Sequence, residues 1–196
     1  MPLLVSGVVL AGGRATRFGS DKLAHPYRGQ PLLHHAVHRL AEVCDDVIVV
    51  RAPGADGAGL PPGVRTVHDP TEGEGPLAGL HAGLLAAVRS DLVVVAGGDM
   101  PDLQPSVLRE MLRVLEEAQV DAVALSQDAR ARPLPCTLRT WPAADLTHTL
   151  LHAGRRRLRD LLDASRLAVI DEATWTALDP DRRTVFDVDE PSDLSR

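Results

Sequence analysis

Glycines and cations are concentrated in one segment near the start of the chain, residues 10–22. The segment contains three glycines and three cations: Gly12, Gly13, Gly19, Arg14, Arg17 and Lys22. A glycine-rich loop can turn several backbone N–H groups onto one anion, and arginine and lysine add the charge that a polyphosphate requires. An apolar run over residues 3–10 precedes the loop and predicts a buried strand. We therefore expect a binding loop for a nucleoside triphosphate at the carboxyl end of that strand.

Two well-known phosphate loops do not match this segment. A Walker loop ends in Gly-Lys-Ser/Thr, and no such tripeptide follows these glycines. The dinucleotide fingerprint needs Gly-x-Gly-x-x-Gly, a spacing that Gly12, Gly13 and Gly19 do not have. The loop must therefore belong to another class of nucleotide-binding protein.

Residues 10–22 resemble the signature L-A-G-G-x-x-x-R-x-G-x-D-K of the MobA-like nucleotidyltransferases, and within that family the molybdenum cofactor guanylyltransferases most of all. Residues 75–79 are similar to the family's G-P-L-A-G, and residues 98–101 to its metal-binding D-x-P. Weaker likenesses cover residues 132–136, similar to an R-x-x-P-L strand region, and residues 154–158, similar to a G-x-R-R-x segment. The resemblance spans most of the chain.

The resemblance implies a single α/β domain over residues 1–196, a three-layer sandwich with a mostly parallel, Rossmann-like sheet of the nucleotide-diphospho-sugar transferase type. The implied enzyme moves GMP from GTP to the terminal phosphate of molybdopterin carrying molybdenum and releases pyrophosphate. Because the attacking phosphate oxygen is already ionised near neutral pH, no general base is required. The expected catalytic residues are Arg17, Lys22 and Asp99. The expected nucleotide contacts are Leu10, Ala11, Gly12, Gly13, Lys22, Asp69, Gly75, Gly79 and Asp99.

Asp99 is the expected ligand of a magnesium ion. Mg²⁺ prefers carboxylate and phosphate oxygens and usually takes only one or two carboxylates from a protein. Asp69 precedes Pro70, so a turn carboxylate is one interpretation of this residue. As a nucleotide ligand, Asp69 would accept hydrogen bonds either from the N–H edge of guanine or from ribose hydroxyls.

The tail over residues 186–194 departs from the family's closing N-x-N-T-P-E-D-L. Asp187 and Asp189 replace both asparagines, and Glu190 replaces the threonine. Ionised aspartate accepts hydrogen bonds but does not donate them, so Asp189 is a candidate second metal ligand. Related cytidylyltransferases carry D-x-D-T-P here, so the alternative is transfer of CMP or another nucleotide to molybdopterin or to another phosphorylated acceptor, such as a sugar phosphate. Those enzymes begin with L-A-A-G and lack G-P-L-A-G, which favours guanine.

A third interpretation is a non-catalytic regulator that binds nucleotides. The presence of both Lys22 and Asp99 argues against this interpretation, because a protein that no longer catalyses the reaction could lose these residues. Arg155 and Arg156, in a run of three arginines beside Gly154, are candidates for binding the acceptor's phosphate, and the solvated face of a helix is the alternative. Expected partners are GTP and molybdenum-molybdopterin as substrates, with apo molybdoenzymes or their chaperones as recipients of the product.

Alternating apolar patterns predict the elements that must position these residues. Helical spacing indicates helices over 31–43, 76–88 and 105–117, and short apolar runs indicate strands over 47–50, 64–68, 92–96 and 122–125. The less regular C-terminal third suggests a strand over 132–138, helices over 141–152 and 155–164, and a strand over 167–170. This order predicts a parallel sheet covered on both faces, with ligands bound outside the carboxyl ends of the strands. The loop after residue 10, Asp69 and Asp99 all follow such ends, so we expect them to form one site.

Composition narrows the class of protein. A formal net charge of −6 over 196 residues argues against general binding of nucleic acid. Cys44 and Cys136 form no metal-type cluster and are expected to be small buried residues or free thiols. The absence of a signal peptide pattern and of a long apolar run predicts a cytoplasmic protein without a membrane-spanning helix.

Overall fold

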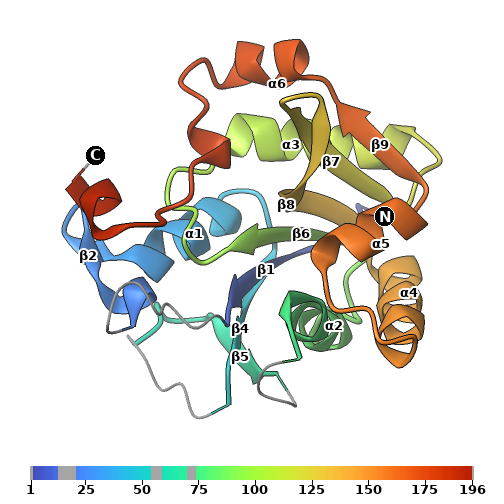
Figure 1. Ribbon diagram of the computed structural model, residues 1–196, viewed down its shortest axis with the longest axis horizontal. Helices are drawn as coiled ribbons and strands as arrows, with labels where there is room; N and C mark the ends of the chain where they lie inside the picture. Colours follow the sequence, from blue (N-terminus) through green and yellow to red (C-terminus); the bar gives the residue numbers. More distant parts are fainter. Residues whose placement is uncertain (1, 13–20, 54–58, 70–73, 196) are drawn as a thin grey trace.

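A seven-stranded sheet forms the centre of the molecule, and helices cover both of its faces (Figure 1). The structure is a computed structural model that describes residues 2–12, 21–53, 59–69 and 74–195. Across the sheet the strands follow the order β5-β4-β1-β6-β8-β7-β9. Their bounds are β1 Val5–Ala11, β4 Asp46–Arg51, β5 Arg65–His68, β6 Leu92–Gly97, β7 Ala122–Gln127, β8 Arg130–Arg139 and β9 Leu167–Ile170.

The sheet is mostly parallel, as predicted. β1, β4, β5 and β6 run in one direction, β7 and β9 pair in parallel, and β8 runs antiparallel to both of its neighbours, β6 and β7. Only Asp128 and Ala129 separate β7 from β8, and a connection this short can join only antiparallel strands. The beginning of β8 therefore lies at the same edge of the sheet as the carboxyl ends of β1 and β6.

Two apolar cores separate the helices into two layers. The helices are α1 Leu32–Ala41, α2 Pro76–Ala86, α3 Pro105–Glu117, α4 Thr140–His152, α5 Leu158–Ala164 and α6 Glu172–Leu178. One core joins α1, α3 and α6 to the sheet, and the other joins α2, α4 and α5 to the opposite face. β6 is buried along its whole length because both layers cover it, which explains its unbroken apolar sequence.

Three parts of the chain differ from the sequence-based prediction. Pro31 ends the short strand β3 and precedes α1 instead of lying in its first turn. α5 begins at Leu158, so Arg155 and Arg156 lie in a connection and not on the predicted helix over 155–164. The reason is Gly154, which has a φ of +76° and leaves the helical path at the end of α4. The sequence analysis did not predict α6, in which Trp175 is the only buried residue.

Small elements join the start and the end of the chain. They are the strands β2 Pro26–Tyr27 and β3 Gln30–Pro31 and the 3₁₀ helices η1 Lys22–Ala24, η2 Arg183–Val185 and η3 Pro191–Ser195. Figure 1 shows the C-terminal segment lying beside β2. Tyr27, Leu32 and Val188 form a small apolar cluster between them, and all three side chains are completely buried. This cluster holds the C-terminal segment against the edge of the sheet where β1 ends.

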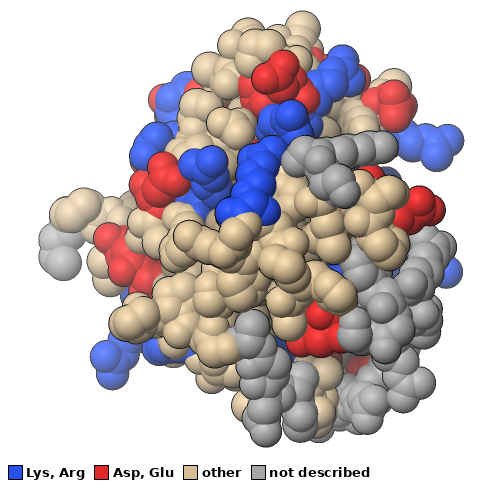
Figure 2. All heavy atoms as spheres, turned by 90° about the vertical axis from the view of Figure 1, so that its left-hand side faces the viewer, with Lys and Arg blue, Asp and Glu red and all other residues tan. Residues whose placement is uncertain are grey.

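The charged surface and the two cysteines are as expected from the sequence. On the face that carries the C-terminal segment, acidic and basic side chains are interspersed (Figure 2). Both cysteines are free thiols, with Cys136 3% exposed, and burial raises the pKa of each to about 12. In the parts of the chain that the structure describes, no helix combines the length and the apolar character that crossing a bilayer requires.

Candidate functional site

The carboxyl ends of four parallel strands converge at one edge of the sheet. Leu10 and Ala11 end β1, and the N–H of Gly98, just after β6, donates to the carbonyl of Leu10 over 3.0 Å. Asp69 directly follows β5, and its N–H donates to the carbonyl of Arg51 at the end of β4 over 2.9 Å. The predicted convergence of residue 10, Asp69 and Asp99 at this edge is therefore present.

Lys22 and Asp99 form the centre of this edge. Lys22 Nζ donates to Asp99 Oδ2 over 2.8 Å and lies 3.9 Å from Asp189 Oδ1. The Lys22 side chain is 13% exposed, whereas those of Asp99 and Asp189 are 32% and 69% exposed. The ammonium group is therefore enclosed, and the two carboxylates remain open to a ligand from outside.

The C-terminal segment brings Asp189 to Asp99 across 90 residues of sequence. The N–H of Val188 donates to the carbonyl of Asp99 over 3.0 Å, and Val188 is anchored in the apolar cluster with Tyr27. Asp193 Oδ2 then accepts hydrogen bonds from the N–H groups of Asp189 and Glu190, both over 3.0 Å. These bonds fix the backbone beside Asp189, so its carboxylate is held near Lys22.

Asp187, the other aspartate of the tail, has a different partner. Its carboxylate pairs with Arg132, which also donates to Gln127 Oε1 over 2.6 Å and to the carbonyl of Leu134 over 2.9 Å. Burial raises the pKa of Asp187, and although Arg132 opposes that effect, the negative charges of Asp99 and Asp189 reinforce it. The two aspartates are therefore not equivalent, because only Asp189 lies within 4 Å of Lys22.

A pocket of about 350 Å³ opens beside these carboxylates. Its walls are Asp99, Met100, Arg132, Pro133, Leu134, Leu158, Asp187 and Asp189. The described residues hold no cluster of three or more His, Cys, Asp or Glu side chains that could bind a metal alone. Two carboxylates with open oxygens suit Mg²⁺, which completes its coordination with phosphate and water. Asp99 and Asp189 therefore fit the expected ion.

Two glycines lie on the nucleotide side of the site, and one of them packs closely against its neighbours. Gly75 has a φ of +84°, and a Cβ there would lie 2.9 Å from the carbonyl oxygen of Arg156. A Cβ at Gly79 would lie 3.7 Å from Asp69 Oδ2, so the Asp69 carboxylate approaches the first turns of α2. The structure thus explains Gly75 by its φ and its packing, whereas a Cβ at Gly79 would make only ordinary contacts. The contacts of both glycines with a nucleotide remain a prediction.

Arg155 and Arg156 lie in the connection between α4 and α5, and their side chains have partners within the protein. Arg156 donates to the carbonyl of Leu151 over 2.8 Å and lies 3.7 Å from Glu74, and Arg155 lies 3.4 Å from Asp160. The backbone of Arg156, by contrast, packs on Gly75. Their proposed contact with the acceptor's phosphate therefore stays a prediction.

The rest of the predicted loop includes Gly13 and Arg17, and both fall outside the described residues. Gly12 ends the described part of the loop, and a Cβ there would lie 3.6 Å from the N of Ala52. The sequence analysis assigned no role to Arg132, although it quoted residues 132–136 as a family likeness. It also missed Asp102, whose carboxylate is 6% exposed and accepts from Tyr27 Oη over 2.9 Å and from Arg28 over 2.8 Å. The only available signal was the position of Asp102 directly after the D-x-P motif.

Known proteins are similar to this chain in both sequence and fold. The model of the MobA-like NTP transferase domain matches residues 7–169. A probable molybdenum cofactor guanylyltransferase of Mycobacterium tuberculosis (strain H37Rv) is 38% identical over 180 residues, which cover 88% of this chain and 87% of that protein. The molybdenum cofactor guanylyltransferase of Burkholderia vietnamiensis is 39% identical over 165 residues, 79% of this chain and 80% of that protein.

Solved structures support the fold. The molybdopterin-guanine dinucleotide biosynthesis protein A of Archaeoglobus fulgidus superposes with a TM-score of 0.79 at 23% identity, over 97% of this chain and 95% of that chain. The 4-diphosphocytidyl-2C-methyl-D-erythritol synthase of Anaerococcus prevotii superposes with a TM-score of 0.70 at 15% identity, over 98% and 93% of the two chains. The match to the family model and the identity to curated relatives together establish that the chain belongs to the MobA-like NTP transferase domain family.

Proposed function

We propose that this protein transfers GMP from GTP to the terminal phosphate of molybdopterin carrying molybdenum and releases pyrophosphate. The observation that carries the proposal is the group of Lys22, Asp99 and Asp189, in which one cation lies 2.8 and 3.9 Å from two open carboxylates. The names of the Mycobacterium and Burkholderia relatives supply the identity of donor and acceptor. In this group, a cation that can bind phosphate lies beside two carboxylates that can bind a metal ion, near the end of β6.

The chemistry requires positioning and neutralisation of charge more than proton transfer. The attacking phosphate oxygen is ionised near neutral pH, so the enzyme must bring two polyanions together and stabilise the charge of the leaving pyrophosphate. Lys22 is suited to this task because its ammonium group is enclosed by protein and needs only to exchange a carboxylate for a phosphate oxygen. Arg17 is proposed to add a second cation from the same loop.

Asp99 and Asp189 are the proposed holders of Mg²⁺, which neutralises phosphate charge when it is bound. Leu10, Ala11, Gly12, Gly13, Asp69, Gly75 and Gly79 are the proposed nucleotide contacts, and Arg155 and Arg156 the proposed acceptor contacts. We further propose that the enzyme acts in the cytoplasm and passes its product to apo molybdoenzymes or their chaperones.

The choice of base is tested by comparing donors. GTP and CTP with Mg²⁺ are each supplied together with molybdenum-molybdopterin, and pyrophosphate release is measured at equal nucleotide concentrations. A pocket built for the N–H edge of guanine leaves buried polar groups unpaired against cytosine, so we expect GTP to be strongly preferred. CMP transfer without GMP transfer would reject the guanylyltransferase and support a cytidylyltransferase.

A matched variant tests whether the proposed phosphate contact is used. Lys22→Ala should weaken transfer at limiting GTP more than at saturating GTP, while Arg113→Ala, at an exposed ion pair on α3, should change neither. Equal activity of Lys22→Ala and the native chain at both concentrations would remove Lys22 from the site. Nucleotide binding without transfer to any phosphorylated acceptor would instead support the non-catalytic regulator.

A further inference from the structure

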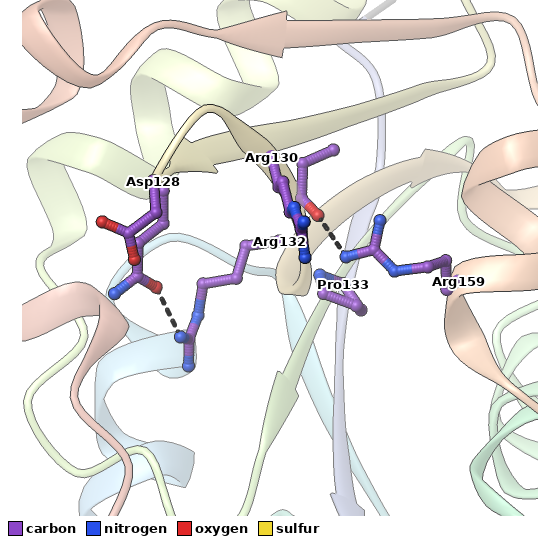
Figure 3. Close-up of a pocket in the computed structure, with 7 residues that line it drawn as sticks. Asp128, Arg130, Arg132, Pro133 and Arg159 are labelled. Carbon is purple, nitrogen blue, oxygen red and sulfur yellow. Dashed lines mark hydrogen bonds between the residues drawn. The ribbon is translucent and has the colours of Figure 1, made fainter.

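A second pocket, of about 630 Å³, adjoins the first at the hairpin between β7 and β8. Three arginines line it: Arg130 and Arg132 from the start of β8, and Arg159 from α5. Figure 3 shows these side chains around the hollow, with Pro133 at its base. Arg132 and Pro133 also line the pocket of Asp99 and Asp189. The two pockets therefore share a wall, and we call the second one the arginine pocket.

The arginine pocket has an excess of positive charge. Arg132 is neutralised by Asp187, but neither Arg130 nor Arg159 forms an ion pair with any residue that the structure describes. Arg159 donates to the carbonyl of Ala131 over 2.8 Å, which holds its guanidinium group over the hairpin. The one carboxylate of the lining, Asp128, lies on the opposite side of the hollow from Arg159 (Figure 3). In a chain with a net charge of −6, two such guanidinium groups at one pocket indicate an anionic ligand.

A tight turn fixes one of these arginines in place. Asp128 and Ala129 have φ values of +50° and +59°, as a two-residue hairpin of the I′ type requires, and Gln127 pairs directly with Arg130. Alanine adopts this conformation only at a cost in free energy, so packing elsewhere must enforce it. Arg130 thus projects from a defined backbone position and not from a loose loop.

The topology places the arginine pocket on the acceptor side of the site. Across the sheet, β5, β4 and β1 lie on one side of β6, and β8 and β7 lie on the other. The proposed nucleotide contacts Leu10, Asp69 and Gly79 belong to the first side. β8 is the neighbour of β6 at about 4.8 Å, but Arg130 lies four residues beyond Leu134, which is level with the end of β6, so the hairpin lies on the order of 15 Å from that end. A ligand whose phosphate reaches Asp99 can therefore extend away from the nucleotide into the arginine pocket.

We propose that the arginine pocket binds a second anionic group of the acceptor, namely the molybdenum-bearing end of molybdopterin. This inference rests on the proposed function, which places the acceptor's phosphate beside Asp99. The metal end carries oxygen and sulfur ligands with negative charge, which accept hydrogen bonds from guanidinium groups. A neutral sugar would offer no negative charge to Arg130 and Arg159, so the pocket favours this acceptor over a sugar phosphate.

The test compares a double variant with a matched control. In Arg130→Gln/Arg159→Gln, both side chains keep much of their length but lose their charge, and because both residues are exposed the fold should be retained. Arg113→Gln removes another exposed arginine, from α3, on the other face of the sheet from α5. Pyrophosphate release is measured against the concentration of molybdenum-loaded and of metal-free molybdopterin at saturating Mg²⁺ and GTP.

The expected result is selective. For the double variant, the KM for loaded molybdopterin should rise about tenfold or more, and that for the metal-free form should rise less, since charged hydrogen bonds are lost only at the metal end. The KM for GTP and the kcat should stay within about twofold of the native values, and Arg113→Gln should match the native chain. An unchanged KM for loaded molybdopterin, or an equal rise for both forms, would overturn the assignment.

A separate measurement distinguishes failure of this inference from failure of the proposed function. If the native chain transfers no GMP to molybdopterin, the proposed function fails, and binding of sodium molybdate is then measured by calorimetry. Molybdate binding that the double variant loses would retain an oxyanion site at the arginine pocket. Lack of molybdate binding by the native chain would overturn the site as well.

Discussion

Replacing Gly75 with alanine tests how the nucleotide side of the site is held to the connection before α5. Gly75 has a φ of +84° and a ψ of +172°, a combination almost confined to glycine. The new Cβ would lie 2.9 Å from the carbonyl oxygen of Arg156 and 3.2 Å from its Cβ. That oxygen cannot simply move aside, because it accepts a hydrogen bond from the N–H of Leu77 over 3.2 Å.

The expected loss of stability has two parts. The positive φ alone costs alanine about 1 to 2 kcal/mol. Moving the Arg156 carbonyl away from Leu77 costs about 1 kcal/mol more for the weakened hydrogen bond. The free energy of unfolding should therefore fall by about 2 to 3 kcal/mol, which lowers the Tm of a domain of this size by roughly 4 to 12 °C.

Gly63 provides the matched control. Its φ is +86°, but apart from its chain neighbours no residue that the structure describes has an atom within 4 Å of the position of a Cβ. Gly63→Ala should therefore show the backbone cost alone, about 1 to 2 kcal/mol. Urea unfolding and calorimetry of both variants give the comparison. Equal losses in the two variants would refute the role of the contact with Arg156.

Three further predictions concern single residues. Asp99→Asn should lower metal-dependent turnover by about a hundredfold or more while changing the Tm little, and unchanged Mg²⁺ dependence in the rate assay would move the metal to another ligand. Burial, together with the nearby His148, lowers the pKa of His81, so folding favours its neutral form. The free energy of unfolding should therefore fall as the pH drops below about 6.5, and it should fall less in His81→Gln. Urea titrations of both proteins at pH 7.5 and 5.5 measure the difference. Burial raises the pKa of Cys44 and of Cys136 to about 12, so iodoacetamide at pH 8 should label neither thiol in the folded protein. In guanidinium chloride it should label both. Rapid labelling of the folded protein, detected by mass spectrometry, would contradict their burial.

The sequence predicted best those elements whose apolar pattern matches their burial. α3 begins and ends where its helical spacing does, because one face of the helix packs on the sheet and the other is solvated. β6 was recognisable because both of its faces are buried. α6 was not, since a seven-residue helix that buries one tryptophan has no periodicity to detect.

The residues of the site were predictable from the sequence, but the contacts between them were not. Residue types, spacing and the family resemblance identified Lys22, Asp99 and Asp189 as candidates, and the structure brings all three together. The division of roles between Asp187 and Asp189 depends on Arg132, which lies 55 residues before Asp187 and reaches it only because β8 is antiparallel. A local pattern carries no information about such a contact, because strand direction is decided by the pairing of the whole sheet.

The strand order also sets a schedule for synthesis on the ribosome. β5, β4, β1 and β6 are complete by residue 97, but β8, which covers the free edge of β6, ends only at residue 139. At about 5 to 20 residues per second, this interval of some 40 residues lasts roughly 2 to 8 s. During that time β6, an apolar strand, is paired with β1 on one side only, and its other edge is the kind that promotes aggregation. We therefore expect the nascent chain to depend most on chaperones in the interval between the emergence of β6 and that of β8.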